Sequence, residues 1–156
     1  GTNPDAVKKL INYQPTNLYI SVYGATPDVY KRTTAWMIEN AFNRVMRSLS
    51  FMKQFSCNTV FRMTLMKNLN MVDAEGYATL IEDAQPTFVE LKGYKAVGGS
   101  QKRLGPEFMP THEEIMAFAE LIQQHTDYTI VDQKENSSVA LLTKGDTDYK
   151  QVLTDA

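Results

Sequence analysis

Two polar side chains, Arg62 and Thr64, interrupt a run of apolar residues between Val60 and Met66. Successive residues of a β-strand point to opposite faces of a sheet, so these two side chains are expected to share a face. A guanidinium and a hydroxyl group placed side by side can bind an anion or a polar cofactor. An interior ion pair with Glu90 of the next predicted strand also explains Arg62. The residues alone leave both interpretations open.

A second segment, from Lys92 to Arg103, contains four basic residues and no acidic one. Gly98 and Gly99 allow a ligand to approach the backbone closely, and Tyr94 offers a flat aromatic face. Basic, glycine-rich segments with an aromatic residue suit contacts with RNA phosphates and bases. A solvated surface loop is the alternative. The predicted loop is longer than about 12–15 residues, which favours a functional segment.

Other residues that could do chemistry have simpler explanations. His112 and Glu113 lack the spacing of a zinc-binding HExxH motif, and Thr111 with Glu114 forms a helix-capping box. Cys57 is the only cysteine, which excludes an internal disulfide and a cluster held by several thiolates of these residues. We therefore expect no metal ligand here.

The composition of the 156 residues sets further limits. The hydrophobic content of 43% is enough for a core, and the net charge of −2 means that an RNA contact would need a local basic patch. No apolar run is long enough to suggest a membrane span. A single cysteine fits a reducing, cytoplasmic setting, which we expect.

Helical and strand patterns alternate along the chain. Apolar residues at helical spacing predict a long helix over about 38–55, and the capping box predicts another from Thr111. Further helices are expected near 7–11, 29–33 and 73–84, and strands at 18–23, 59–65, 88–91, 128–131 and 139–142. The last two strands read as a hairpin across 135–138.

This alternation predicts an α/β fold with parallel strands, crossover helices and a short terminal hairpin. Glu90 and Lys92, like Arg62 and Thr64, place polar groups within strands. An open doubly wound sheet would bury such groups on both faces, whereas a barrel can direct them toward its interior site. We therefore expect part of a barrel.

Four segments together resemble one known family, the radical-SAM tRNA 4-demethylwyosine synthases. The resemblance extends from about Asn3 to Lys144. It rests on the joint pattern rather than on any single segment. The segments are Pro15–Val22, Thr59–Lys67 with R-x-T-L-x-K, Lys92–Leu104 with G-Y-x-x-V-G-x-S-x-x-R-L, and Met109–Glu114 with M-P-T-H-E-E.

The resemblance implies that residues 1–144 form the C-terminal part of a partial TIM-like radical-SAM barrel, followed by a polar tail at 145–156. It implies a lyase that uses S-adenosylmethionine and a 4Fe–4S cluster. The implied reaction condenses N1-methylguanosine of tRNA(Phe) with a two-carbon unit of pyruvate to give 4-demethylwyosine, a step of tRNA processing on the way to wybutosine.

Roles carry over from the family only where residues match. Catalytic residues stay unassigned. Cofactor contacts are expected from Ser21, Arg62 and Thr64. Contacts with tRNA or substrate are expected from Lys92, Tyr94, Gly98, Ser100, Lys102 and Arg103. A structural role is expected for Met109, Pro110, His112 and Glu113.

The chain also departs from the family pattern. The cluster-binding Cys-x-x-x-Cys-x-x-Cys motif and the lysine that forms an imine with pyruvate lie upstream in the family, so Lys67 and Lys92 should not inherit the latter role. Tyr23-Gly24 and Ser138 stand where other polar residues are common in the family, which weakens contacts at those positions.

We therefore expect this chain to lack the N-terminal half of the barrel. Alone, it should hold no cofactor, be inactive and self-associate through an unpaired sheet edge. A non-catalytic RNA-binding or adaptor domain and a barrel enzyme acting on a sugar or phosphate substrate are the alternatives.

Overall fold

Five strands form a single mixed sheet in the computed structural model, which describes residues 1–35 and 37–145. The predicted tail lies, apart from Gly145, outside the described residues. The strand order across the sheet is β1-β2-β3-β5-β4. The strands are β1 (Asn17–Val22), β2 (Asn58–Leu65), β3 (Phe88–Gly93), β4 (Thr129–Lys134) and β5 (Val139–Thr143).

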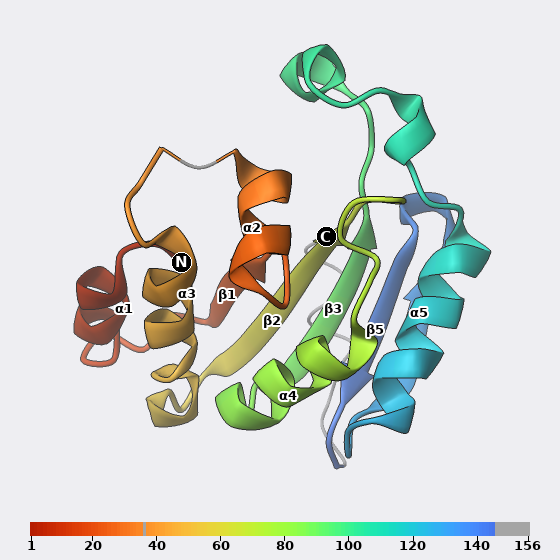
Figure 1. The fold of residues 1–156 in the computed structure, drawn as a ribbon. Coiled ribbons are helices and arrows are strands. Elements are labelled where there is room, and N and C mark those ends of the chain that lie inside the picture. Colours follow the sequence, from red (N-terminus) through yellow and green to blue (C-terminus); the bar gives the residue numbers. More distant parts are fainter. Residues whose placement is uncertain (36, 146–156) are drawn as a thin grey trace.

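The strand directions confirm the predicted fold class. β1, β2 and β3 run parallel, and their carboxyl ends lie together at the upper edge of the sheet in Figure 1. β5 pairs with β3 in the antiparallel sense and forms the expected terminal hairpin with β4. The predicted order of elements is also confirmed.

Helices follow the expected capping signals. They are α1 (Pro4–Leu10), α2 (Pro27–Thr34), α3 (Ala41–Leu49), α4 (Ala74–Ala84) and α5 (His112–Gln124). Thr111 and Glu114 form both hydrogen bonds of the predicted capping box at the start of α5. No helix among the described residues is long and apolar enough to cross a membrane.

The long helix predicted over 38–55 is wrong at both ends, since α3 spans only Ala41–Leu49. Asn40 adopts a left-handed conformation with φ of 55°, which a continuing α-helix cannot accommodate. Ile38 is 46% exposed rather than part of the core. After α3 the chain forms a short 3-10 turn at Met52–Gln54. The apolar residues of this turn continue the helical spacing of the sequence, which is why the helix was predicted to extend too far.

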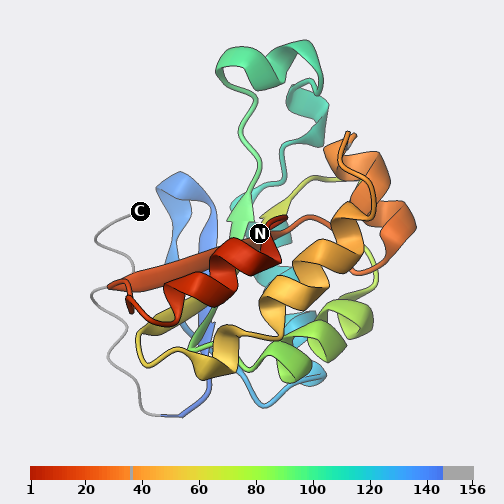
Figure 2. The same ribbon diagram turned by 90° about the vertical axis from the view of Figure 1, so that its left-hand side faces the viewer.

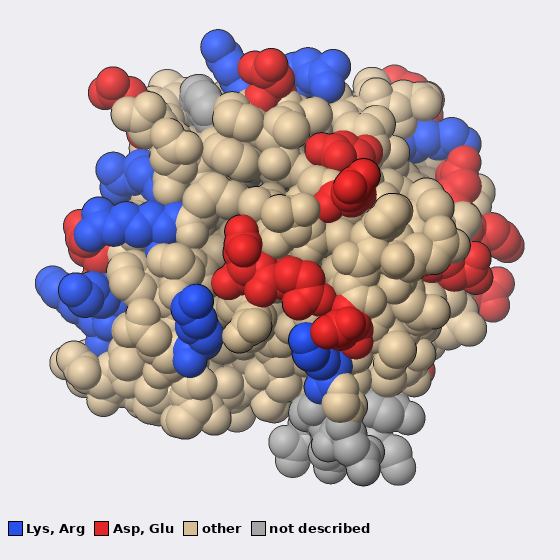
Figure 3. Space-filling model, turned by 60° about the horizontal axis from the view of Figure 1, so that its bottom comes forward, with Lys and Arg blue, Asp and Glu red and all other residues tan. Residues whose placement is uncertain are grey.

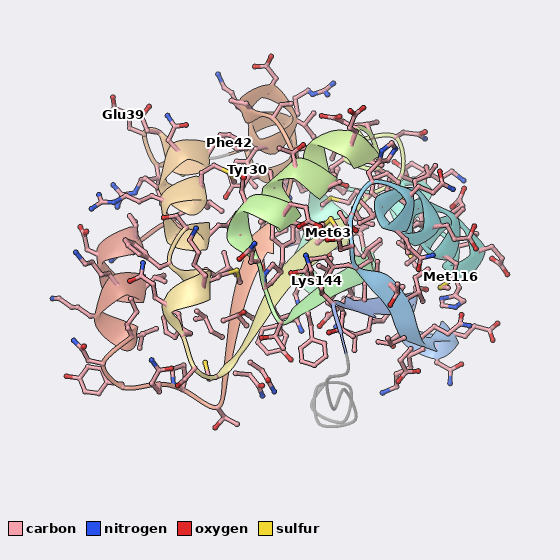
Figure 4. The ribbon with its side chains drawn as sticks, turned by 90° about the horizontal axis from the view of Figure 1, so that it is seen from below. Tyr30, Glu39, Phe42, Met63, Met116 and Lys144 are labelled. Atoms are coloured by element: carbon pink, nitrogen blue, oxygen red, sulfur yellow. The ribbon has the colours of Figure 1, made fainter. Side chains whose placement is uncertain are left out.

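The two faces of the sheet differ in what covers them. α3, α4 and α5 pack on one face, where Met63 of β2 lies against their apolar side chains (Figure 4). The other face has a small apolar cluster of strand residues only, and no described α-helix covers it (Figure 2). That cluster comprises Val60, Phe88 and Leu141 with Tyr19 and Val131. On the same face, polar residues follow this cluster toward the carboxyl ends of β1, β2 and β3.

Candidate functional site

Five polar strand residues lie on the helix-free face and are called the polar row below. Strand register places Ser21 beside Arg62 and Arg62 beside Glu90. One step nearer the carboxyl ends, Thr64 lies beside Lys92. The prediction that Arg62 and Thr64 share a face is confirmed by this alternation.

Arg62 forms the interior ion pair that the sequence left open. Its Nε lies 2.9 Å from Oε1 of Glu90, and its Nη2 donates to Oε2 at 2.9 Å. The guanidinium also lies over the ring of Tyr19, 4.3 Å from the centroid. Glu90 is fully buried. Because two nitrogens face one carboxylate, the orientation of Arg62 is fixed before any ligand arrives.

The other members of the polar row are uncommitted. Ser21, Thr64 and Lys92 are half-buried. Their side-chain polar groups have no hydrogen-bond or ion-pair partner among the residues that the structure describes. Two hydroxyls and an ammonium can together bind a polar or anionic ligand beside the fixed guanidinium.

Asn70 fixes the carboxyl ends of β1 and β2, and sequence analysis missed it. Its Nδ2 donates to the carbonyl oxygens of Tyr23 and Thr64, at 3.1 and 2.9 Å. Its Oδ1 accepts from the backbone of Met66 at 2.6 Å, and its own carbonyl accepts from the Tyr77 hydroxyl. A buried amide with these partners sets the strand spacing at the polar row.

The segment 94–105, called the glycine loop below, rises from the end of β3 and projects beyond the sheet (Figure 1). Tyr94 is only 7% exposed, and its hydroxyl donates to the carbonyl of Leu104 at 2.8 Å. Ser100 bonds within the loop, to Val97 and Lys95. The expectation that Tyr94 offers a free face for a base is therefore wrong, because its ring is buried in the loop's base.

The tip of the glycine loop is open to a ligand. Gly98 has a positive φ of 56°, and a Cβ there would meet no atom within 4 Å. Lys102 is exposed. Two short 3-10 turns, Gly98–Lys102 and Pro106–Phe108, shape what the sequence showed only as a long loop. These features suit close approach of an anionic backbone.

Arg103 brings the end of the loop back to the strands. Its Nη1 donates to the carbonyl of Thr33 in the last turn of α2, at 2.9 Å. Arg103, Thr33, Tyr23 and Met66 line a hollow of about 290 Å³ together with Thr34. Arg103 therefore ties the end of the glycine loop to α2, near the residues that follow β1 and β2.

Two of the departures from the family pattern, at Gly24 and Ser138, have structural explanations. Gly24 lies so close to α2 that a Cβ would be 2.4 Å from the backbone nitrogen of Tyr30. Ser138 is buried in a left-handed conformation, with φ of 50°, and its Oγ accepts from Nζ of Lys95 at 3.1 Å. Position 138 thus supports the base of the loop.

The residues for which no catalytic or metal-binding role was expected form ordinary ion pairs and hydrogen bonds or are partly buried. Lys67 pairs with Glu114, whose pKa is lowered chiefly by that hydrogen bond. Nε2 of His112 lies 2.7 Å from Oε1 of Gln133. Burial raises the pKa of Cys57, which disfavours a reactive thiolate. Within residues 1–35 and 37–145, no three His, Cys, Asp or Glu residues are grouped to hold a metal ion.

Comparison with known proteins gives consistent matches. The family description "wyosine base formation" matches residues 83–144. The S-adenosyl-L-methionine-dependent tRNA 4-demethylwyosine synthase of Pyrococcus abyssi is 39% identical over 151 residues, covering 95% of this chain and 44% of that protein. A structure of TYW1 with a lysine–pyruvate adduct bound has a TM-score of 0.81 and 31% identity, covering 92% of this chain and 45% of that one.

A more distant match concerns the fold alone. Coproporphyrinogen III oxidase (HemN) from Escherichia coli, a radical SAM enzyme, is 10% identical with a TM-score of 0.60, covering 98% of this chain and 35% of that one. The chain spans somewhat less than half the length of the demethylwyosine synthases that it matches. With sequence motifs, fold and matched residues in agreement, the chain belongs to the radical-SAM tRNA 4-demethylwyosine synthase family.

Proposed function

We propose that this chain supplies part of the active site of an enzyme that converts N1-methylguanosine of tRNA(Phe) and pyruvate into 4-demethylwyosine. The observation that carries the proposal is that the polar row and Arg103 of the glycine loop lie toward the same end of the sheet. The names of the matched relatives, including the lysine–pyruvate adduct of one, support 4-demethylwyosine as product and pyruvate as substrate. N1-methylguanosine and tRNA(Phe) are what the family resemblance implies. A cytoplasmic setting accompanies this proposal.

The polar row is the proposed contact with S-adenosylmethionine and the small substrate. Ser21 and Thr64 offer hydroxyl groups, and Lys92 offers a cation for a carboxylate. Arg62, held by Glu90, presents only its remaining N–H groups. When bound, the cofactor supplies the radical chemistry, while these residues bind and orient polar groups.

The 4Fe–4S cluster does not fit the residues of this chain. Such clusters are held by several thiolates, and Cys57 is the only cysteine. We therefore propose that the chain alone is inactive and that the cluster ligands come from elsewhere in the enzyme. Iron and sulfide analysis after anaerobic reconstitution should find well below one cluster per chain; about four irons per chain would contradict this.

The glycine loop is the proposed contact with the tRNA. Its open tip at Gly98 and the exposed Lys102 suit a phosphate group and an unstacked nucleotide. Substituting Lys102→Ala should weaken binding of an anticodon stem–loop RNA by about threefold to tenfold and lower its salt dependence by about one unit of slope. Lys144→Ala is the matched control, because Lys144 follows β5 at the opposite end of the sheet.

The enzymatic proposal is tested most simply in cells that make this protein. Disrupting the coding region of residues 1–156 should abolish the tricyclic nucleoside of tRNA(Phe) and cause N1-methylguanosine to accumulate. Mass spectrometry of digested tRNA measures both nucleosides. An unchanged tricyclic nucleoside in the disrupted strain would contradict the proposed reaction and leave only an RNA-binding role.

A further inference from the structure

Charge is distributed unequally along the chain. Residues 1–57 contain seven Lys or Arg and three Asp or Glu, whereas residues 58–156 contain nine and fifteen. Figure 3 shows the consequence in space, because basic side chains gather over α1 and α3 at the left and acidic ones dominate from the middle to the right. A protein with net charge −2 therefore carries a locally positive side.

Six exposed basic side chains on α1, α2 and α3 make up this side, called the basic flank below. They are Lys8 and Lys9 of α1, Lys31 and Arg32 of α2, and Arg44 and Arg47 of α3.

Direct contacts join α1 to α3. Nη2 of Arg47 lies 3.5 Å from Oδ1 of Asp5, and Nε of Arg44 donates to the carbonyl of Thr2 at 2.6 Å. Asp5 is the only acidic residue in α1. The two helices therefore present their basic side chains as one surface rather than as separate spots.

Contacts also join α3 to α2, and α2 to the glycine loop. The rings of Tyr30 and Phe42 meet edge to face, with centroids 5.8 Å apart (Figure 4). Arg103 of the loop donates to the carbonyl of Thr33. The helices that carry the basic flank are thus linked by direct contacts to the glycine loop, which is proposed to meet the anticodon loop.

The far end of the flank is hollowed. A depression of about 510 Å³ is lined by Lys8, Lys9, Asn12 and Gln54, with Asp5 and Ile11 completing it. Ammonium and amide groups are donors that phosphate oxygens accept. Double-stranded RNA is recognised mostly through its backbone, and such contacts need positive charge spread along a surface rather than an enclosed pocket.

We propose that the basic flank binds the phosphate backbone of the substrate tRNA outside the anticodon loop, while the glycine loop and polar row receive the modified base. This inference rests on the proposed function, because it takes tRNA as the substrate. It adds a second contact surface, on the outer side of α1, α2 and α3.

The test compares two charge-neutralising double variants of this chain. K8Q/K9Q removes two flank cations from a helix, and Gln is about as good a helix former as Lys. The matched control K53Q/K144Q removes the same charge from Lys53, which shares a hollow with Asp83, and from Lys144, which pairs with Asp127 at the opposite end of the sheet. Each is titrated with whole tRNA(Phe) and with its isolated anticodon stem–loop, over a range of salt concentrations.

K8Q/K9Q should bind whole tRNA about tenfold more weakly, with a salt slope smaller by about two, and should bind the stem–loop as the parent does. Equal binding of whole tRNA by K8Q/K9Q and the control would overturn the inference. An equal loss for both RNAs would overturn the placement outside the anticodon loop. A failure of the proposed glycine-loop contact would give a different result. The parent chain would not bind the stem–loop, or Lys102→Ala would leave the affinity for the stem–loop unchanged.

Discussion

The polar row and the glycine loop occupy the same end of the sheet but are held in different ways. In the polar row, parallel strand pairing fixes the position of each residue, and Glu90 holds Arg62 through two contacts. In the glycine loop, residues 97–99 and 101–103 are exposed. The loop is held at its base by Tyr94 and by the contact of Lys95 with Ser138, and at its end by Arg103.

This difference matches the needs of the two proposed ligands. A small cofactor or oxo-acid gains most from groups already oriented, because no ordering cost is paid on binding. An RNA loop must be captured from many conformations, so an adaptable segment on fixed anchors suits it. Substitutions in the polar row should therefore reduce stability, whereas substitutions at the loop tip should reduce RNA binding alone.

The largest effect is expected from Glu90→Ala. It leaves Arg62 beside the strands without its carboxylate, and breaking a buried ion pair on one side costs about 3 kcal/mol. Chemical denaturation monitored by circular dichroism measures this loss. The double variant R62M/E90L removes both charges and should recover most of the stability; a double variant as unstable as Glu90→Ala would show that the pair is not what fixes this region.

Asn70→Ala should come next, at about 2 kcal/mol, because it leaves a buried backbone N–H and two carbonyl oxygens without their amide partner. Hydrogen exchange should speed up in β1 and β2 near Tyr23 and Thr64 more than in β5. Uniform acceleration across the sheet would argue against a local clamp at the strand ends.

Tyr94→Phe tests the base of the glycine loop and should cost about 1 kcal/mol, the net value of one hydrogen bond. The expected signature is faster exchange and proteolysis within the loop with little change in the sheet. Tyr13→Phe is a matched control, because Tyr13 is 80% exposed. Equal effects of the two substitutions would contradict the anchoring role of Tyr94.

The smallest effect, about 0.5 kcal/mol, is expected from Glu114→Gln at neutral pH. Lys67 holds the pKa of Glu114 below its usual value, so the pair stabilises the fold above the unfolded pKa and loses this effect as pH falls through the folded one. The cost of the substitution should therefore shrink as pH falls below the usual pKa of a glutamate. If the stability cost of Glu114→Gln persists at this low pH, it comes from the capping hydrogen bond with Thr111 rather than from the ion pair.

Sequence patterns predicted correctly those features of the fold that depend on residues close together in the chain. The capping residues of α5, the alternation in β2 and the terminal hairpin all depend on neighbours in the chain. Asn70 escaped detection because its partner Tyr23 is distant in sequence. The burial of Tyr94 could not be predicted, because a side chain buried within its own loop produces no periodic pattern in the sequence. The start of α3 could not be predicted either, because it depends on the left-handed backbone conformation of Asn40.

We propose that the polar row and the glycine loop form one site at the carboxyl ends of β1, β2 and β3. Amide chemical-shift mapping of this chain with the tRNA(Phe) anticodon stem–loop measures which residues the RNA contacts. Shifts are expected in residues 94–104 together with Thr64 and Lys92. Shifts confined to α4 and the C-terminal half of α5 would contradict a shared site.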